Sequence, residues 1–279
     1  MASVYSMIDN HISCALQGEP DSGDEMPRPA GRPLKQSEII ARALTAQIVS
    51  ERLPEGTRLP NEREMLESFQ IGRSTLREAL RLLESRGVLT IRSGRDGGPI
   101  VRSPKASDLG EALTLLLQFE KVSFSEVFYA RQVLEPLVAR LAAQQVSLDT
   151  LAALDASNAR MATNIQDREV FREETINFHS LIASSAECPV LELLVGALES
   201  VAGGLAYGAV PANFTDQQRA RALAAHEEIA ESLRTGSPED AEVAMATHLL
   251  EGGESWRVAY ADLNQVPVEW ASIDARYSS

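Results

Sequence analysis

Apolar residues recur along the chain with periods that predict mostly helices. Between residues 37 and 51 they recur every three or four positions, as expected for a helix that buries one face. Residues 88–92 and 99–101 are β-branched and apolar and flank a glycine-rich turn, which predicts a β-hairpin. From residue 107 to residue 263 only helical periods occur. The helices predicted there span residues 107–121, 123–145, 147–165, 167–187, 189–208, 215–235 and 238–263.

Residues 60–84 are predicted to form two short helices joined by a turn at residues 70–72. Asn61 can cap the first helix, and Glu64, three residues on, completes a capping box. The second helix has a leucine stripe and an arginine stripe, formed by Leu76, Leu80 and Leu83 and by Arg73, Arg77 and Arg81. A helix-turn-helix needs this division, because one face packs on the domain while the other enters the DNA major groove.

The hairpin directly follows this motif, as a wing does. The fold class is therefore predicted to be mainly α, with an N-terminal winged helix-turn-helix and a C-terminal all-α bundle of six to seven helices. We expect a flexible leader over residues 1–33, a winged DNA-binding domain over 34–103, a helical effector-binding and dimerisation domain over 107–263, and a tail over 264–279. A bundle of this length can bury a substantial core and hold a ligand between its helices.

Charge is distributed unevenly along the chain. The net charge of -14 argues at first sight against a nucleic-acid partner. However, residues 35–105 contain 13 basic and 9 acidic side chains, whereas residues 106–279 contain 11 basic and 26 acidic ones. A basic module joined to an acidic body suits a DNA-binding head on a body that does not adhere to DNA.

The two cysteines, Cys14 and Cys188, are far apart, and no CxxC pair occurs. Neither a zinc ribbon nor a disulfide framework is therefore expected, and a cytoplasmic location fits. We find no signal peptide at the N-terminus. The most apolar long run, residues 190–210, contains Glu192 and Glu199, so we interpret it as a buried helix rather than a membrane span.

The sequence LPNERE, followed by IGRSTLREALRLLESRGVLTIRSGRDGGPIV, resembles the DNA-binding domain of the GntR family of bacterial transcription regulators. The family pattern is matched almost throughout, over roughly residues 37–102. The helical remainder resembles the C-terminal domain of the FadR-type branch of that family, whose members respond to fatty acids or organic acids. This second resemblance rests on ARQVLEPLVARLAA with Arg131 and Glu135, on NFHSLIASSAECPVL around His179, and on the later His226 and His248.

The first resemblance implies that operator DNA is contacted by Arg63, Arg73, Thr75 and Arg77, and by the wing residues Gly94 and Arg95. Near the start of a recognition helix, a bidentate arginine–guanine pair discriminates between bases by about 1–3 kcal/mol. This role suits Arg73 and Arg77.

Phosphate contacts, which set the register of the protein on DNA, are better suited to Arg63, Ser74 and Thr75. The alternative for any one arginine is a solvated charge or an ion pair with Glu67, Glu78 or Glu84. For Arg81 that alternative is preferred.

Three of the four histidines fall in predicted helices of the body, and their apolar neighbours indicate that they point inward. They are His179, His226 and His248. Three converging imidazoles would suit Zn²⁺, Ni²⁺ or Mn²⁺, with the remaining positions open to water or an effector carboxylate. The alternative is that they are core residues, or that they hydrogen-bond an anionic effector directly.

Metal-binding members of the branch have an Asp or Asn one turn before the first histidine. Here that position is Thr175, which is neutral and a poor ligand. Glu174 is adjacent but lies about 100° around the helix from the needed direction. The resemblance therefore implies a three-histidine site that binds metal more weakly.

Arg131 is the candidate for binding the carboxylate of the effector through a bidentate fork. Asn177 and Tyr129 are candidates for lining the same cavity. The alternative role of Arg131 is an ion pair with Glu135, four residues on along the same helix face.

These features favour a ligand-responsive, homodimeric transcription regulator that is not an enzyme. We expect a repressor that binds double-stranded operator DNA and takes a small organic acid into its helical body. One alternative keeps the DNA-binding role but has an acyl-CoA effector in a long apolar cavity, without metal. Another is a metal-dependent enzyme, against which stands the lack of an evident general base beside the histidines.

Overall fold

The computed structural model describes residues 34–94, 97–208, 214–259 and 268. The chain divides into two compact units, Met1–Pro104 and Lys105–Ser279, which are described separately below. The predicted leader, including Cys14, lies outside the described residues, as does Arg95 at the tip of the predicted wing.

The described part of the N-terminal unit has three helices and a hairpin, as predicted. Helix α2 (Gln36–Ser50) is followed by α3 (Glu62–Phe69) and α4 (Arg73–Ser85), and then by strands β1 (Leu89–Arg92) and β2 (Gly98–Val101). Their apolar faces meet in one core, which includes Leu44 from α2, Met65 from α3, Leu76 and Leu83 from α4, and Leu89 from β1. The leucine stripe predicted for α4 is thus the face that packs on the domain.

Local hydrogen bonds explain why α3 and α4 begin and end where they do. The side chain of Asn61 accepts from the N–H of Glu64 at 3.1 Å, and the Glu64 carboxylate accepts from the N–H of Asn61 at 3.0 Å. The predicted capping box is therefore confirmed. Gln70 ends α3 in the left-handed conformation, with φ 51°, and α4 begins directly after Gly72. The predicted turn at residues 70–72 is confirmed as well.

The wing is an antiparallel hairpin in which Leu89 faces Val101 and Arg92 faces Gly98. The preceding loop adds a third segment, because the N–H of Val101 donates to the carbonyl of Thr57 at 2.8 Å. The turn itself requires glycine. Gly94 has φ +112°, and a β-carbon at Gly97 would lie 2.3 Å from the carbonyl oxygen of Arg92.

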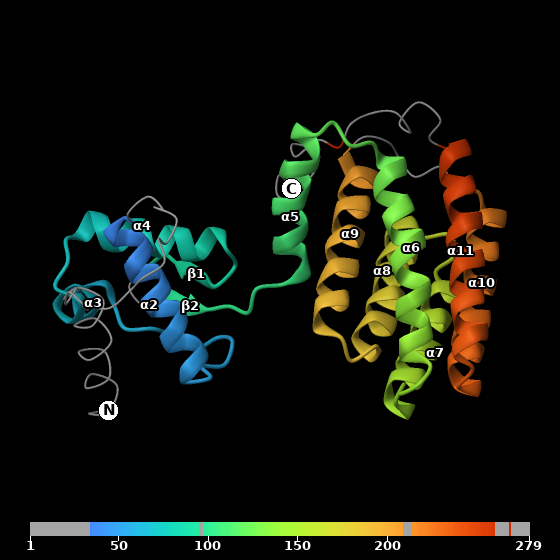
Figure 1. Cartoon of the computed structure of the whole chain (residues 1–279), viewed down its shortest axis with the longest axis horizontal. Coiled ribbons are helices and arrows are strands. Elements are labelled where there is room, and N and C mark those ends of the chain that lie inside the picture. Colours follow the sequence, from blue (N-terminus) through green and yellow to red (C-terminus); the bar gives the residue numbers. More distant parts are fainter. Residues whose placement is uncertain (1–33, 95–96, 209–213, 260–267, 269–279) are drawn as a thin grey trace, which may run out of the picture. The chain divides into compact units, whose positions relative to one another are not determined.

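The described part of the C-terminal unit contains only helices, which lie side by side as a bundle (Figure 1). They are α5 (Ala106–Phe119), α6 (Phe124–Ala142), α7 (Leu148–Thr163), α8 (Arg168–Ser185), α9 (Pro189–Gly208), α10 (Asp216–Thr235) and α11 (Pro238–Ala259). Helix α6 packs against α8, α9 and α11, and α5 packs against α9. The predicted fold class is confirmed, with seven helices among the described residues of this unit.

The core of this unit is built around α6, α8, α10 and α11 and includes Phe128, Phe178, Ile229 and Met245. Of the predicted tail, the structure describes only Val268, which is buried and whose N–H donates to the carbonyl of Val122 at 2.8 Å. Within the described ranges, no helix combines the length and the apolar content that crossing a membrane requires.

Candidate functional site

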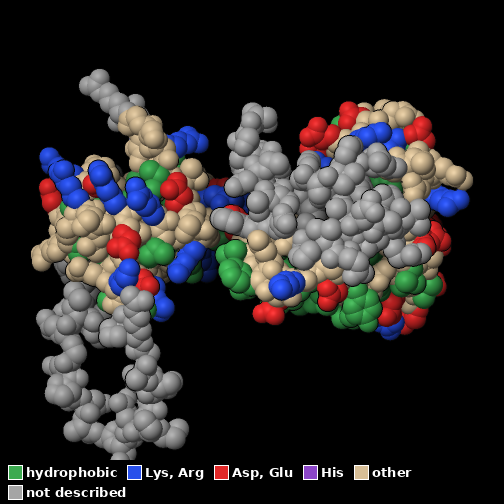
Figure 2. Space-filling model, turned by 90° about the horizontal axis from the view of Figure 1, so that it is seen from above, with side chains coloured by type: hydrophobic (Ala, Val, Ile, Leu, Met, Phe, Trp, Pro, Cys, Tyr) green, Lys and Arg blue, Asp and Glu red, His purple; other side chains and the backbone are tan. Residues whose placement is uncertain are grey.

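Helix α4 presents its arginines to solvent. Arg73, Ser74, Arg77 and Arg81 are exposed, whereas Thr75 is half-buried beside the leucines that pack on the core. Lys and Arg side chains are prominent on the surface of the N-terminal unit in Figure 2. The two faces expected of a DNA-reading helix are therefore present on α4.

Two of the candidate DNA-contacting arginines have acidic neighbours. The Nε atom of Arg77 lies 3.3 Å from Oε1 of Glu62, and the Nε atom of Arg63 lies 3.4 Å from Oε1 of Glu67. Glu67, which pairs with Arg63, was among the acidic partners considered for the arginines. Glu62, which pairs with Arg77, was not anticipated. Exposed pairs of this kind contribute only about 0–1 kcal/mol, so DNA can replace them at little cost.

The start of α4 is suited to an anion. Its N-cap is Gly72, which has no capping side chain, and the first turn contains no acid. The free N–H groups and the helix dipole therefore favour a phosphate at this end. Of the two predicted wing contacts, Gly94 lies in the turn of the hairpin, and Arg95 is outside the described residues. The DNA contacts themselves stay predictions.

The structure brings the three histidines of the body together. Nε2 of His226 lies 3.2 Å from Nε2 of His248, which in turn lies 3.3 Å from Nε2 of His179. They come from α8, α10 and α11, and all three are buried. Phe178 stacks on the His226 ring with centroids 4.1 Å apart, which holds that imidazole in place.

This geometry fits a metal ion. Ligand nitrogens bound tetrahedrally at 2.0–2.1 Å from Zn²⁺ are separated by about 3.3 Å, as the Nε2 atoms are here. Burial is the largest effect that lowers the pKa of His226 and His248, that of His248 to about 3, and the neighbouring imidazoles add to it. Both rings are therefore neutral near pH 7, as metal ligation requires.

A chain of charged groups supports His179 from behind. Its Nδ1 lies 2.6 Å from Oε2 of Glu135, which fixes the ring so that Nε2 faces the other two histidines. The second oxygen of Glu135 accepts from Nε of Arg131 at 2.6 Å, and Nη2 of Arg131 donates to Glu199 on α9. All four residues are buried. The ion pair with Glu135, which was the alternative role of Arg131, is thus present. Glu199 is a second carboxylate partner of the same arginine.

Burial and charge act in opposite directions on the two carboxylates. Burial disfavours ionisation of Glu135, but the Arg131 guanidinium and His179 outweigh it and hold the pKa of Glu135 well below its usual range. Burial raises the pKa of Glu199; Arg131 opposes that rise, while the like charge of Glu135 reinforces it. Although both acids contact the same arginine, the charged form of Glu199 is stabilised less than that of Glu135.

Glu199 is the residue that sequence reasoning missed. It was noted only as a charge that argues against a membrane span. Its position in a long apolar run was the available signal, because a charge inside a buried helix needs a partner. The partner lies 68 residues away along the chain, at Arg131, and only the fold brings the two together.

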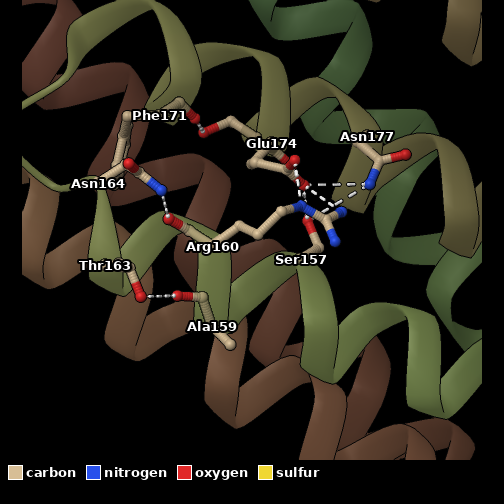
Figure 3. Close-up of polar contacts among 9 residues, drawn as sticks. Ser157, Ala159, Arg160, Thr163, Asn164, Phe171, Glu174 and Asn177 are labelled. Carbon is tan, nitrogen blue, oxygen red and sulfur yellow. Dashed lines mark hydrogen bonds and ion pairs between the residues drawn. The ribbon is translucent and has the colours of Figure 1, made fainter.

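Thr175 does not take over the role of the missing acid. Its hydroxyl donates to the carbonyl of Phe171 on the same helix at 2.9 Å. The adjacent Glu174 points to α7 instead, where Arg160 donates to it from Nε at 2.5 Å and from Nη2 at 2.8 Å (Figure 3). These contacts agree with the prediction that Glu174 is not a metal ligand.

Two candidate cavity residues have other surroundings. The side-chain amide of Asn177 donates to Glu174 at 3.2 Å, on the side of α8 that faces Ser157 (Figure 3). Tyr129 is 67% exposed, so it does not line the interior near the histidines. An effector contact for Asn177 stays a prediction.

Comparisons with known proteins match both units. Residues 36–96 match the family model described as "Bacterial regulatory proteins, gntR family", and residues 126–251 match that of the FCD domain. The chain is 28% identical over 243 residues to the HTH-type transcriptional repressor NanR of Edwardsiella tarda, covering 82% of this chain and 90% of that protein. It is 29% identical over 170 residues to the galactonate operon transcriptional repressor of Escherichia coli, covering 60% and 74%.

Among solved structures, a GntR protein of Streptococcus agalactiae is similar to this chain with a TM-score of 0.61 and 28% sequence identity. The match covers 78% of this chain and 99% of that one. The likeness therefore extends over both the DNA-binding and the helical parts.

Proposed function

Because the chain belongs to the GntR family of bacterial regulatory proteins and is a DNA-binding transcription regulator rather than an enzyme, we propose that it represses its target genes as a homodimer and responds to a small organic acid. Its named relatives are repressors, which supports repression. The observation that carries the proposal is the exposed arginine face of α4, within the residues that match the family.

In this proposal α4 is the recognition helix. Arg73 and Arg77 read base edges in the major groove, and Arg63, Ser74 and Thr75 bind phosphates, as does the wing through Gly94 and Arg95. Paired heads of a homodimer then match an inverted repeat in the operator.

The DNA assignment is tested by fluorescence anisotropy with the DNA upstream of the protein's own gene. Arg77→Ala should weaken specific binding about tenfold or more, because a bidentate base contact contributes about 1–3 kcal/mol. Arg81→Ala, on the same helix, is the matched control and should change binding less. Specific binding and salt dependence left unaltered by Arg77→Ala would contradict the placement of α4 in the groove.

The helical domain is the proposed receptor for the organic acid. His179, His226 and His248 would hold one divalent ion (Zn²⁺, Ni²⁺ or Mn²⁺), which when bound supplies a positive charge for a carboxylate. The buried polar cluster favours this over an acyl-CoA effector, because an acyl chain needs an apolar cavity and is poorly matched to a site of charged groups and imidazoles. One relative is named for the galactonate operon, so galactonate is a suitable first probe.

Metal analysis of the purified protein tests this part. We expect about one ion per chain in the wild type and much less in His248→Ala, together with a fall in the melting temperature on adding a chelator. A protein that takes up no ion from Zn²⁺, Ni²⁺ or Mn²⁺ solutions would contradict the metal site and favour direct anion binding by the histidines.

A further inference from the structure

Glu199 occupies the arginine that the proposed effector needs. A guanidinium offers two-point binding to a carboxylate along two edges, Nε with Nη2 and Nη1 with Nη2. Both edges include Nη2, and in this structure Nη2 of Arg131 donates to Glu199. Nε of Arg131 is held by Glu135 at 2.6 Å. Because Nη2 belongs to both edges and already donates to a buried carboxylate, an incoming carboxylate competes with Glu199 for Arg131.

Charge leads to the same conclusion independently. Two carboxylates, those of Glu135 and Glu199, face one guanidinium in a buried site. A further anion at Arg131 would be a third carboxylate around one guanidinium, and neighbouring like charges repel strongly where water is excluded. Removing Glu199 from Arg131 relieves that repulsion, whereas removing Glu135 would also release His179.

We propose that Glu199 is a resident substitute for the effector carboxylate, so that ligand binding exchanges Glu199 for the ligand on Arg131. This inference rests on the proposed organic-acid function and adds to it a means of regulation. The exchange breaks the link between α6 and α9, because Arg131 belongs to α6 and Glu199 to α9.

Helix α9, which carries Glu199, is in close contact with α5, the first helix of the unit. A β-carbon on Gly110 of α5 would lie 2.8 Å from Cβ of Ser200, the residue after Glu199. One on Gly196 of α9 would lie 2.6 Å from Cβ of Ala106 of α5. Because the two helices pack closely through these small residues, a shift of α9 is transmitted to α5. Helix α5 begins directly after residues 102–105, which connect it to the DNA-binding domain.

The test compares wild-type protein, Glu199→Gln and Glu192→Gln, all as full chains loaded with Zn²⁺. Galactonate, citrate and acetate are titrated by calorimetry. Glu199→Gln keeps the shape of the side chain but removes the competing charge, so at least one acid should bind about tenfold more tightly than to wild type. Glu192→Gln, an exposed position on the same helix, should bind as wild type does.

Hydrogen exchange measured with and without galactonate supplies a second readout, because a purely structural role of Glu199 would not make the exchange of α9 amides respond to the ligand. Galactonate should speed exchange of α9 amides in the wild type, and Glu199→Gln should show faster exchange before any acid is added. Should Glu199→Gln fold poorly, Glu199→Asp keeps the charge but is too short to hold Nη2, and it should show the same faster exchange.

The possible failures are distinguishable. If wild type binds an acid but Glu199→Gln binds it equally or more weakly, the proposed replacement of Glu199 by the ligand is wrong, and the proposed effector class stands. If no acid binds to either protein, the proposed effector class is wrong, and so is the proposed replacement of Glu199 by the ligand.

Discussion

Glu174 joins two helices of the bundle through a single carboxylate. Arg160 of α7 donates to both of its oxygens, and Ser157 of α7 adds a hydrogen bond at 2.8 Å. The hydrogen bonds from Arg160 are the largest effect and hold the pKa of Glu174 below its usual value, although partial burial opposes them. A carboxyl group stabilised in its charged form makes the stability of the fold depend on pH.

The sign of that dependence follows from the lowered pKa. The contribution of Glu174 is complete above the unfolded pKa of about 4.3 and is lost as the pH falls through the lower folded value. Because Arg160 is half-exposed, Glu174→Gln should cost only about 0.5–1 kcal/mol at pH 7. In urea unfolding followed by circular dichroism, this cost should shrink progressively as the pH falls below about 4.3. Glu173→Gln, an exposed neighbour, should show neither effect, and a cost independent of pH would contradict the role of the charge.

The burial of some side chains could be predicted from the sequence, whereas the pairing of others could not. The alternation of leucine and arginine on α4 predicted Leu76, Leu80 and Leu83 as buried, because a helical period alone decides which face is apolar. The pairing of Arg131 with Glu199 could not be predicted in this way, since it depends on how α6 and α9 pack. The same holds for Glu135, which was considered only as a partner of Arg131 and also holds His179.

At the scale of helices, the packing of α5 on α9 depends on two glycines. The contacts of Gly196 with Ala106 and of Gly110 with Ser200 bring the two backbones together. Sequence reasoning placed both helices correctly to within two residues at each end, because caps and periods are local signals. It gave no sign that these glycines lie at a helix contact, since partner choice is set by the tertiary fold.

We predict that Gly196→Ala destabilises the helical domain. Alanine gains up to about 1 kcal/mol over glycine in a helix interior, but overpacking costs about 1–3 kcal/mol, and the added β-carbon would lie 2.6 Å from that of Ala106. Packing should therefore outweigh propensity, with a lower melting temperature as the readout. Ala106→Gly in the same chain removes the clash and should restore most of the loss. A double variant no more stable than Gly196→Ala would contradict this account.

At the scale of the molecule, α5 is apolar on its outer side as well as on the side that faces α9. Leu109 is 41% exposed, Leu116 65% and Phe119 79%, and the three lie along one stripe of the helix. A helix that is hydrophobic all round is normally buried. This stripe supports the proposed homodimer, because a second copy that supplies its own α5 can cover both stripes by two-fold symmetry.

Phe119→Glu should therefore shift the protein from dimer to monomer in sedimentation experiments, because it places a charge in an apolar contact. Operator affinity should fall by about a hundredfold or more, since two linked heads bind through a high effective concentration that a monomer lacks. Val243→Glu replaces another exposed apolar residue, on α11, and should leave both properties unchanged. A Phe119→Glu protein that stays dimeric would place the interface elsewhere. A monomer that binds the operator as tightly as wild type would instead show that α4 needs no partner to read its site.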